Sequence, residues 1–194
     1  MNKLGRKIMS ITLCVGLILG LMPVFQVTTR AEIDYRDDGK TAIVDNDTDF
    51  KTALSNENVK KIIIAQDFDM TMYTFTSSFN REIIIDGLYN GEIHALSQNS
   101  ENNMFLLQNT SRVTLQNLII NAGTSSGPIV IGHENCASYL IMDHVTVNCT
   151  AGNTSYGTGL HIYSSGATAE VNNCVFNGEG KTQKNLKYTI TAAH

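Results

Sequence analysis

Four polar residues that could hold a cation recur at one position of a repeated sequence pattern. They are spaced by 30, 27 and 29 residues, and they are Asp86, Gln116, Asp143 and Asn172. Carboxylate and amide oxygens are the ligands that Ca²⁺ prefers in proteins. If each residue lies on its own strand, neighbours stack ~4.8 Å apart, so Asp86 and Asp143 lie ~10 Å apart. One Ca²⁺ ion shared by Asp86 and Asp143 would therefore need help from Gln116. Glu170 is expected to face the same way, one strand position from this row.

Asp143 and His144, which are adjacent in the chain, are the candidate catalytic residues. A second interpretation is purely structural: an outward-facing Asp followed by a His that tolerates a bent backbone. We favour the structural interpretation. Lys60, Lys61 and Arg81 are interpreted as isolated surface charges.

The chain repeats a nine-residue pattern three times, and each copy ends in Asn. The copies are VTLQNLIIN (113–121), LIMDHVTVN (140–148) and AEVNNCVFN (169–177), with a partial copy IIIDGL at 83–88. Apolar residues alternate on both sides of the fifth position, as in half-buried strands. The residue types at the fifth position tolerate positive φ. We therefore predict that the chain bends there in every copy, which would stack the bends in a ladder at Gly87, Asn117, His144 and Asn173.

Short apolar runs precede the copies, at 105–107, 129–131 and 160–162. Recurring units of this kind indicate a repeat architecture. We therefore predict an all-β solenoid whose rungs each contain three short parallel strands around an aliphatic core. The alternative, an antiparallel sandwich, would need two-residue hairpin turns and a reversed register, so we disfavour it.

The strand–bend–strand pattern resembles the right-handed parallel β-helix of the pectate-lyase-like superfamily, over roughly 59–176. The resemblance implies a stacked asparagine ladder at the bend, where Asn117 and Asn173 match. The opening, with its VKKIII strand and IIIDG turn, resembles the pectate-lyase-like adhesin domains of Gram-positive surface proteins. That likeness implies a module for adhesion or for binding a polysaccharide or a host-matrix glycan.

One segment is similar to the lyases themselves. IMDHV at 141–145 matches a pectate lyase segment in which Ile-Asp-His follows a Trp, but here Leu140 takes the place of the Trp. The chain has only two prolines and no Arg after Arg112, so the Arg-x-Pro-x-x-Arg motif that carries the base is absent. We therefore expect a non-catalytic module without a cofactor. The alternative is a Ca²⁺-dependent polysaccharide lyase or hydrolase whose active site lies partly in later rungs.

Residues 1–31 have the features of a secretory signal peptide: a basic start, an apolar stretch at 8–21 and small residues around Ala31. A retained membrane anchor is the alternative, although the apolar stretch is shorter than the ~20 residues a spanning helix needs. Cleavage would leave ten basic and 18 acidic residues, a net charge of −8. This balance argues against nucleic acid and anionic membrane as partners. The signal-peptide features predict a secreted or cell-surface protein, and the resemblance to Gram-positive surface proteins implies a Gram-positive bacterium as its source.

The remaining chain divides into a linker with a capping helix (32–58) and the β-helix (59–194). Thr48 or Asp47 is expected to cap the helix, whose apolar face is Phe50, Ala53 and Leu54. Residues 188–193 are expected to begin another rung, which would make the β-helix incomplete at its C-terminal end.

The cysteines carry little functional information. Cys174 is expected in the core, since it occupies an inward position of the third copy. Cys136 and Cys149 lie at or near turns and could pair.

Overall fold

The computed structural model describes residues 32–75, 81–98, 103–122, 128–131, 137–149 and 159–178, together with the backbone of 181–191. The chain divides into two compact units, Met1–Glu32 and Ile33–His194. Only the second unit is described below, so the expected signal peptide at 1–31 lies outside the described residues. In the described part of the chain, no helix combines the length and the apolar character needed to cross a membrane.

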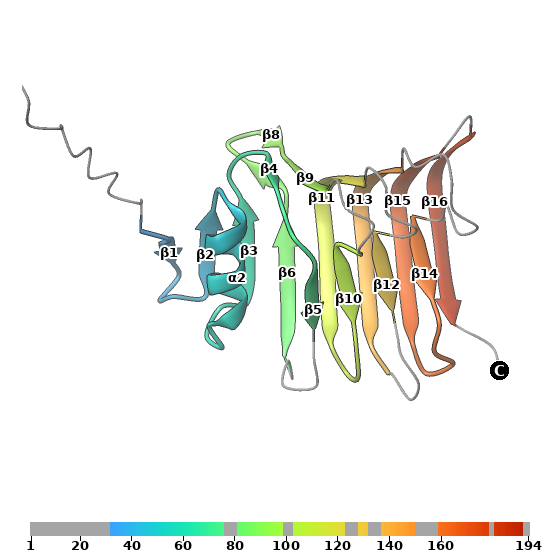
Figure 1. Ribbon diagram of the computed structural model, residues 1–194, viewed down its shortest axis with the longest axis horizontal. Coiled ribbons are helices and arrows are strands. Elements are labelled where there is room, and N and C mark those ends of the chain that lie inside the picture. Colours follow the sequence, from blue (N-terminus) through green and yellow to red (C-terminus); the bar gives the residue numbers. More distant parts are fainter. Residues whose placement is uncertain are drawn as a thin grey trace, which may run out of the picture. The chain divides into compact units, whose positions relative to one another are not determined.

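The repeated pattern forms parallel strands that lie side by side in one long sheet (Figure 1). Equivalent residues of successive copies are in register, with Val113 opposite both Ile83 and Leu140. The parallel strands are β2 (Thr41–Val44), β3 (Lys61–Ile64), β6 (Glu82–Asp86), β11 (Arg112–Ala122), β13 (Tyr139–Cys149) and β15 (Thr168–Gly178).

The short apolar runs form a second parallel sheet, and a third row of strands completes each rung. The second sheet contains β5 (Tyr73–Phe75), β10 (Phe105–Leu107), β12 (Ile129–Ile131) and β14 (Leu160–Ile162). In the third row, β4 (Phe68–Asp69) pairs with β9 (Ala95–Gln98), which pairs with the second half of β11. The fold is therefore the predicted right-handed parallel β-helix.

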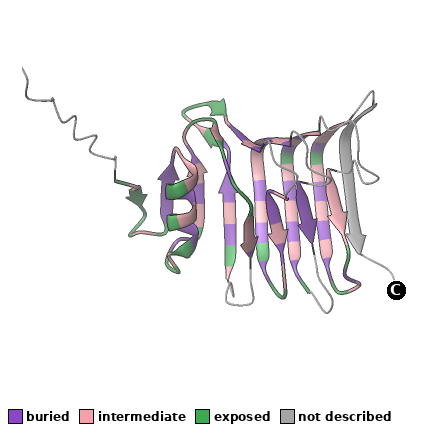
Figure 2. Ribbon diagram, in the orientation of Figure 1, coloured by how far each residue is buried: buried purple, intermediate pink, exposed green. Residues whose placement is uncertain are grey.

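The core lies inside this coil, where the inward residues of each strand stack on their equivalents in the next rung. Figure 2 shows buried and partly exposed positions alternating along β11 and β13. Leu115, Met142 and Val171 stack in this way and are at most 1% exposed. Cys174 is fully buried, as predicted. Burial of apolar surface contributes about 25 cal/mol per Å², so these stacked columns are the main source of stability.

Three of the four expected bends have left-handed backbones: φ is 48° at Asn117, 54° at His144 and 53° at Asn173. The prediction was wrong for Gly87, which has no left-handed φ. Glycine is needed there for a different reason, because a Cβ at Gly87 would lie 2.2 Å from the carbonyl oxygen of Asn117.

In this rung the chain forms a hairpin after Gly87, whereas each of the later rungs bends at a single residue. Its strands β7 (Leu88–Tyr89) and β8 (Glu92–Ile93) are antiparallel. They are joined by Asn90 and Gly91, whose φ values of 50° and 87° fit a two-residue hairpin turn. The chain then returns through His94 to β9.

The capping helix α2 (Asp47–Ser55) lies between β2 and β3 in the chain and covers the N-terminal end of the core. Its N-cap is Asn46 rather than the expected Thr48 or Asp47, since the Asn46 side chain accepts a hydrogen bond from the Asp49 N–H at 2.9 Å. The predicted apolar face is buried, and the Phe50 ring packs 6.4 Å from the ring of Phe105. Strand β1 (Asp34–Arg36) pairs antiparallel with β2.

The C-terminal end differs from the prediction. Strand β16 (Lys181–Thr191) runs antiparallel to β15, with Thr191 opposite Thr168 and Lys181 opposite Gly178. Residues 188–191 therefore do not begin another parallel rung, and 192–193 lie outside the described residues. Only two residues separate β15 from β16, enough for a hairpin, whereas a parallel crossover needs a dozen or more.

Candidate ligand-binding groove

The outward side chains of β6, β11, β13 and β15 form three rows across the rungs, because the strands are in register. The row nearest the bend contains the four residues expected to share one line, Asp86, Gln116, Asp143 and Asn172. The middle row is Ile84, Thr114, Ile141 and Glu170. The row farthest from the bend is Glu82, Arg112, Tyr139 and Thr168.

Asp86 is 4% exposed, and its carboxylate is surrounded by donors. The Lys61 ammonium lies 2.8 Å from Oδ2, and the Gln116 amide donates to the same oxygen at 2.7 Å. Oδ1 accepts from the Asn117 amide and the Leu88 N–H, both at 3.0 Å. Burial by itself would raise the pKa of Asp86, but these donors outweigh burial and lower the pKa below its ordinary value. The contacts leave Asp86 little capacity to bind a cation, and Lys61 is not the isolated charge we expected.

Asp143 and His144 contact each other in an exposed position, with 2.9 Å between Asp143 Oδ1 and His144 Nδ1. The Asn173 amide donates to the same carboxylate oxygen at 3.1 Å. Within the described ranges, no group of three or more His, Cys, Asp or Glu side chains could hold a metal ion. The pair therefore has the geometry of an Asp-supported imidazole without a metal cluster around it.

The asparagine ladder lies elsewhere than the resemblance implied. Asn117 and Asn173 each donate to the aspartate of the preceding rung. The amide ladder is formed by the last residue of each copy: Asn177 donates to Asn148 at 2.6 Å, and Asn148 donates to Asn121 at 2.7 Å. The Asn that ends all three copies was the sequence signal for this ladder.

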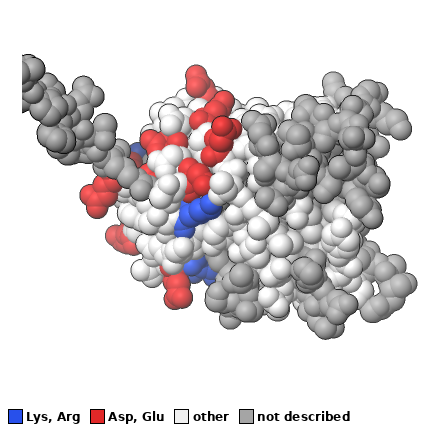
Figure 3. Space-filling view, in the orientation of Figure 1, with Lys and Arg blue, Asp and Glu red and all other residues white. Residues whose placement is uncertain are grey.

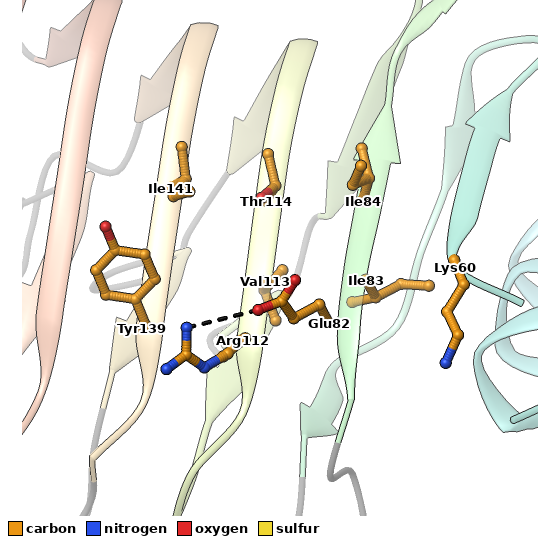
Figure 4. A pocket seen from close by; sticks show the side chains of 9 residues that line it. All are labelled: Lys60, Glu82, Ile83, Ile84, Arg112, Val113, Thr114, Tyr139 and Ile141. Carbon is orange, nitrogen blue, oxygen red and sulfur yellow. Dashed lines mark hydrogen bonds and ion pairs between the residues drawn. The ribbon is translucent and has the colours of Figure 1, made fainter.

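A groove of about 410 Å³ lies over the other two rows (Figure 4). Ile84, Thr114 and Ile141 line its apolar part, and Lys60, Glu82, Arg112 and Tyr139 contribute its larger polar side chains. The sequence alone did not indicate Glu82, Arg112 and Tyr139 as site residues, because only the strand register places them in one row. One signal was available in the sequence: Tyr139 is an aromatic residue at an outward strand position, and the equivalent residue one repeat earlier is the charged Arg112.

Contacts with its neighbours hold Tyr139 in place within the groove. The Arg112 guanidinium lies 5.7 Å from the centre of the Tyr139 ring and 3.5 Å from the Glu82 carboxylate. The Tyr139 hydroxyl donates to the Glu170 carboxylate, and this hydrogen bond raises the pKa of Tyr139. Glu170, a predicted candidate, thus supports the groove. The groove combines apolar and aromatic side chains with a few polar and charged groups, as small-ligand sites commonly do.

The cysteines expected near turns are only partly described. Cys149 is half-buried and free of a disulfide, and burial raises the pKa of its thiol. Cys136 lies outside the described residues, but because Cys149 is a free thiol, the structure does not bear out the suggested bond between the two.

The coil and its outward groove define a parallel β-helix protein. The chain belongs to the family described as a pectate lyase-like adhesive domain, whose model matches residues 41–158, more than half of its length. The matched segment includes the residues that line the groove and, from the row nearest the bend, Asp86, Gln116 and Asp143. No curated protein and no solved structure matches the chain.

Proposed function

We propose that this chain is the ligand-binding module of a secreted or cell-surface adhesin, and that the groove binds a glycan of a polysaccharide or of the host matrix. The observation that carries the proposal is Tyr139, held between the Arg112 guanidinium and the Glu170 carboxylate. The family description as an adhesive domain supports the same class of function. The signal-peptide features of residues 1–31 support secretion.

The side chains of the groove suit the chemistry of a sugar. A sugar ring offers an apolar C–H face and a polar edge of hydroxyl groups, and Tyr139 offers an apolar ring with a polar tip. The Arg112 guanidinium can donate several hydrogen bonds in one plane to the oxygens of a sugar. Because Tyr139 is already held by two neighbours, little side-chain entropy would be lost on binding.

Charged side chains of both signs line the groove, which combines Lys60 and Arg112 with Glu82. On the face shown in Figure 3, opposite the face viewed in Figure 4, more of the visible charged side chains are acidic than basic. Weak binding at such a groove is compatible with adhesion, because several copies on one surface raise the overall avidity.

The test is direct binding by the full chain, produced by a secreting host and screened against a panel of immobilised glycans. For a glycan that binds, Tyr139→Ala should lower the affinity about tenfold, since aromatic residues at the centre of a site commonly contribute more than 1 kcal/mol. Tyr163→Ala is the matched control, because Tyr163 is 61% exposed and stacks on His161 in the second sheet.

Two outcomes would contradict the proposal. Equal binding by wild type and Tyr139→Ala would place the glycan site elsewhere. Failure of the folded wild type, verified by circular dichroism, to bind any glycan of the panel would argue against glycan adhesion itself.

A further inference from the structure

Arg112 is held only loosely by its acidic neighbour in the groove. The distance between the Arg112 guanidinium and the Glu82 carboxylate is 3.5 Å, at the long end of a hydrogen bond. The side chains are 61% and 77% exposed. Exposed pairs of this kind contribute little to stability, so the Glu82 side chain can move away from Arg112 at small cost. Figure 4 shows Glu82 reaching across Val113 toward the guanidinium.

A ligand in the groove must therefore compete with Glu82 for Arg112. A guanidinium presents a planar fork that matches the two oxygens of a carboxylate or sulfate. A neutral hydroxyl group offers one oxygen without charge, so it replaces the Glu82 carboxylate poorly. An anionic group on the ligand can make the same charged hydrogen bonds to Arg112 as the Glu82 carboxylate does.

Building on the proposed glycan-binding function, we propose that Glu82 is an internal competitor for Arg112, and that this pair makes the groove selective for glycans that carry a carboxylate or a sulfate. Arg112 binds the anionic group, Tyr139 contacts the ring that carries it, and Glu82 turns outward when the ligand enters. Lys60 adds a second positive charge to the groove.

The test uses the full secreted chain and calorimetric titration with polyuronate, carboxyl-reduced polyuronate, a sulfated glycan and its desulfated form. Glu82→Gln should raise affinity for the two anionic polymers about two- to fivefold, because an exposed ion pair opposes binding by less than about 1 kcal/mol. It should leave affinity for the two neutral polymers unchanged. Arg112→Gln should lower affinity for the anionic polymers about tenfold.

The control for net charge is Glu92→Gln, which removes one carboxylate from the exposed strand β8, outside the groove lining. If Glu82→Gln and Glu92→Gln raise affinity equally, long-range charge explains the effect and the competitor role is wrong. Selectivity between the polyuronate and the sulfated glycan identifies the anion that the groove prefers.

Three further outcomes separate the inference from the function on which it rests. Equal affinity for the anionic and neutral polymers would overturn the selectivity and leave glycan binding intact. Polyglutamate binding as tightly as the anionic glycans, with the same dependence on Arg112, would show that the groove recognises acidic polymers without regard to the sugar. Binding of none of the polymers by the folded wild type would refute the proposed function itself.

Discussion

The Lys61 ammonium lies 2.8 Å from the Asp86 carboxylate and joins two neighbouring strands of the long sheet, β3 and β6. The exposed fraction of the side chain is 35% for Lys61 and 6% for Asp86. The same carboxylate accepts from Gln116 in the following rung and from Asn117 at the bend. Asp86 thus connects three consecutive rungs on the outer surface of the coil.

Replacing Asp86 by Ala should lower the free energy of unfolding by about 3 kcal/mol, since removing one member of a buried ion pair leaves its donors unsatisfied. Asp143→Ala is the matched control, because Asp143 stands in the same row but its side chain is 44% exposed. The control should cost about 0.5 kcal/mol or less. Urea unfolding followed by circular dichroism measures both values. Equal losses in the two variants would show that the Asp86 contacts contribute no special stability.

Lowering the pH should reduce the free energy of unfolding, and protonation of Asp86 should account for part of the loss. The pKa of Asp86 is lowered in the folded chain, from an ordinary value of 3.8. A lowered pKa means that the carboxylate stabilises the fold above pH 3.8, and that this stability is lost as the pH falls through the folded-state pKa. Asp86→Asn should therefore lose less stability than wild type between pH 5 and pH 3. Parallel losses, measured from urea midpoints across this range, would contradict the assignment.

The two glycines around the hairpin should respond differently to the same substitution. Gly87→Ala should cost about 3 kcal/mol, because its Cβ would lie 2.2 Å from the Asn117 carbonyl and the neighbouring rung would have to move. Gly91 has a φ of 87° but open space around the position of a Cβ. Gly91→Ala should cost only the strain of a left-handed backbone, about 1 kcal/mol. Thermal unfolding of both variants tests this order, and a larger loss for Gly91→Ala would reverse the argument.

The sequence was sufficient to predict the coil because its signals are local. Alternating apolar residues and recurring bend residues predict strands and turns without knowledge of their neighbours, and Asn117 and His144 bend as expected. Gly87 was misinterpreted because glycine serves both left-handed backbones and close contacts, and only the structure separates the two. At the start of α2, Asn46, Asp47 and Thr48 are all good N-caps, so sequence alone could not choose between them.

The contacts between rungs were harder to predict. Tyr139 and Arg112 are 27 residues apart and become neighbours only through the register of β11 and β13. The sequence correctly predicted that Asp86 and Asp143 lie in one row. It did not predict the donors around Asp86, because they come from three different elements, β3, β7 and β11. The direction of β16 is set by its two-residue connection to β15, which is too short for a parallel crossover, whereas the repeat pattern alone predicted another parallel strand.

The amide ladder should contribute to stability in proportion to the number of hydrogen bonds that each residue makes. Asn148 donates to Asn121 and accepts from Asn177, whereas Asn177 has only its bond to Asn148 among the side-chain contacts described. Asn148→Ala should therefore cost about 2 kcal/mol and Asn177→Ala about 1 kcal/mol, at roughly 1 kcal/mol for each hydrogen bond. Urea unfolding distinguishes the two. An equal loss in both variants would show that the ladder does not act as a chain of linked bonds.

The lyase alternative makes a prediction opposite to that of the adhesin. A Ca²⁺-dependent lyase needs free carboxylates beside a base, but Asp86 is occupied by Lys61 and by amide donors. We expect no unsaturated uronide, measured by ultraviolet absorbance, from acidic polysaccharides with or without Ca²⁺. We also expect no rise in melting temperature with millimolar Ca²⁺, since an ion that binds the folded state would stabilise it. Ca²⁺-dependent product that disappears in Asp143→Ala would make the chain an enzyme and assign Asp143 to its site.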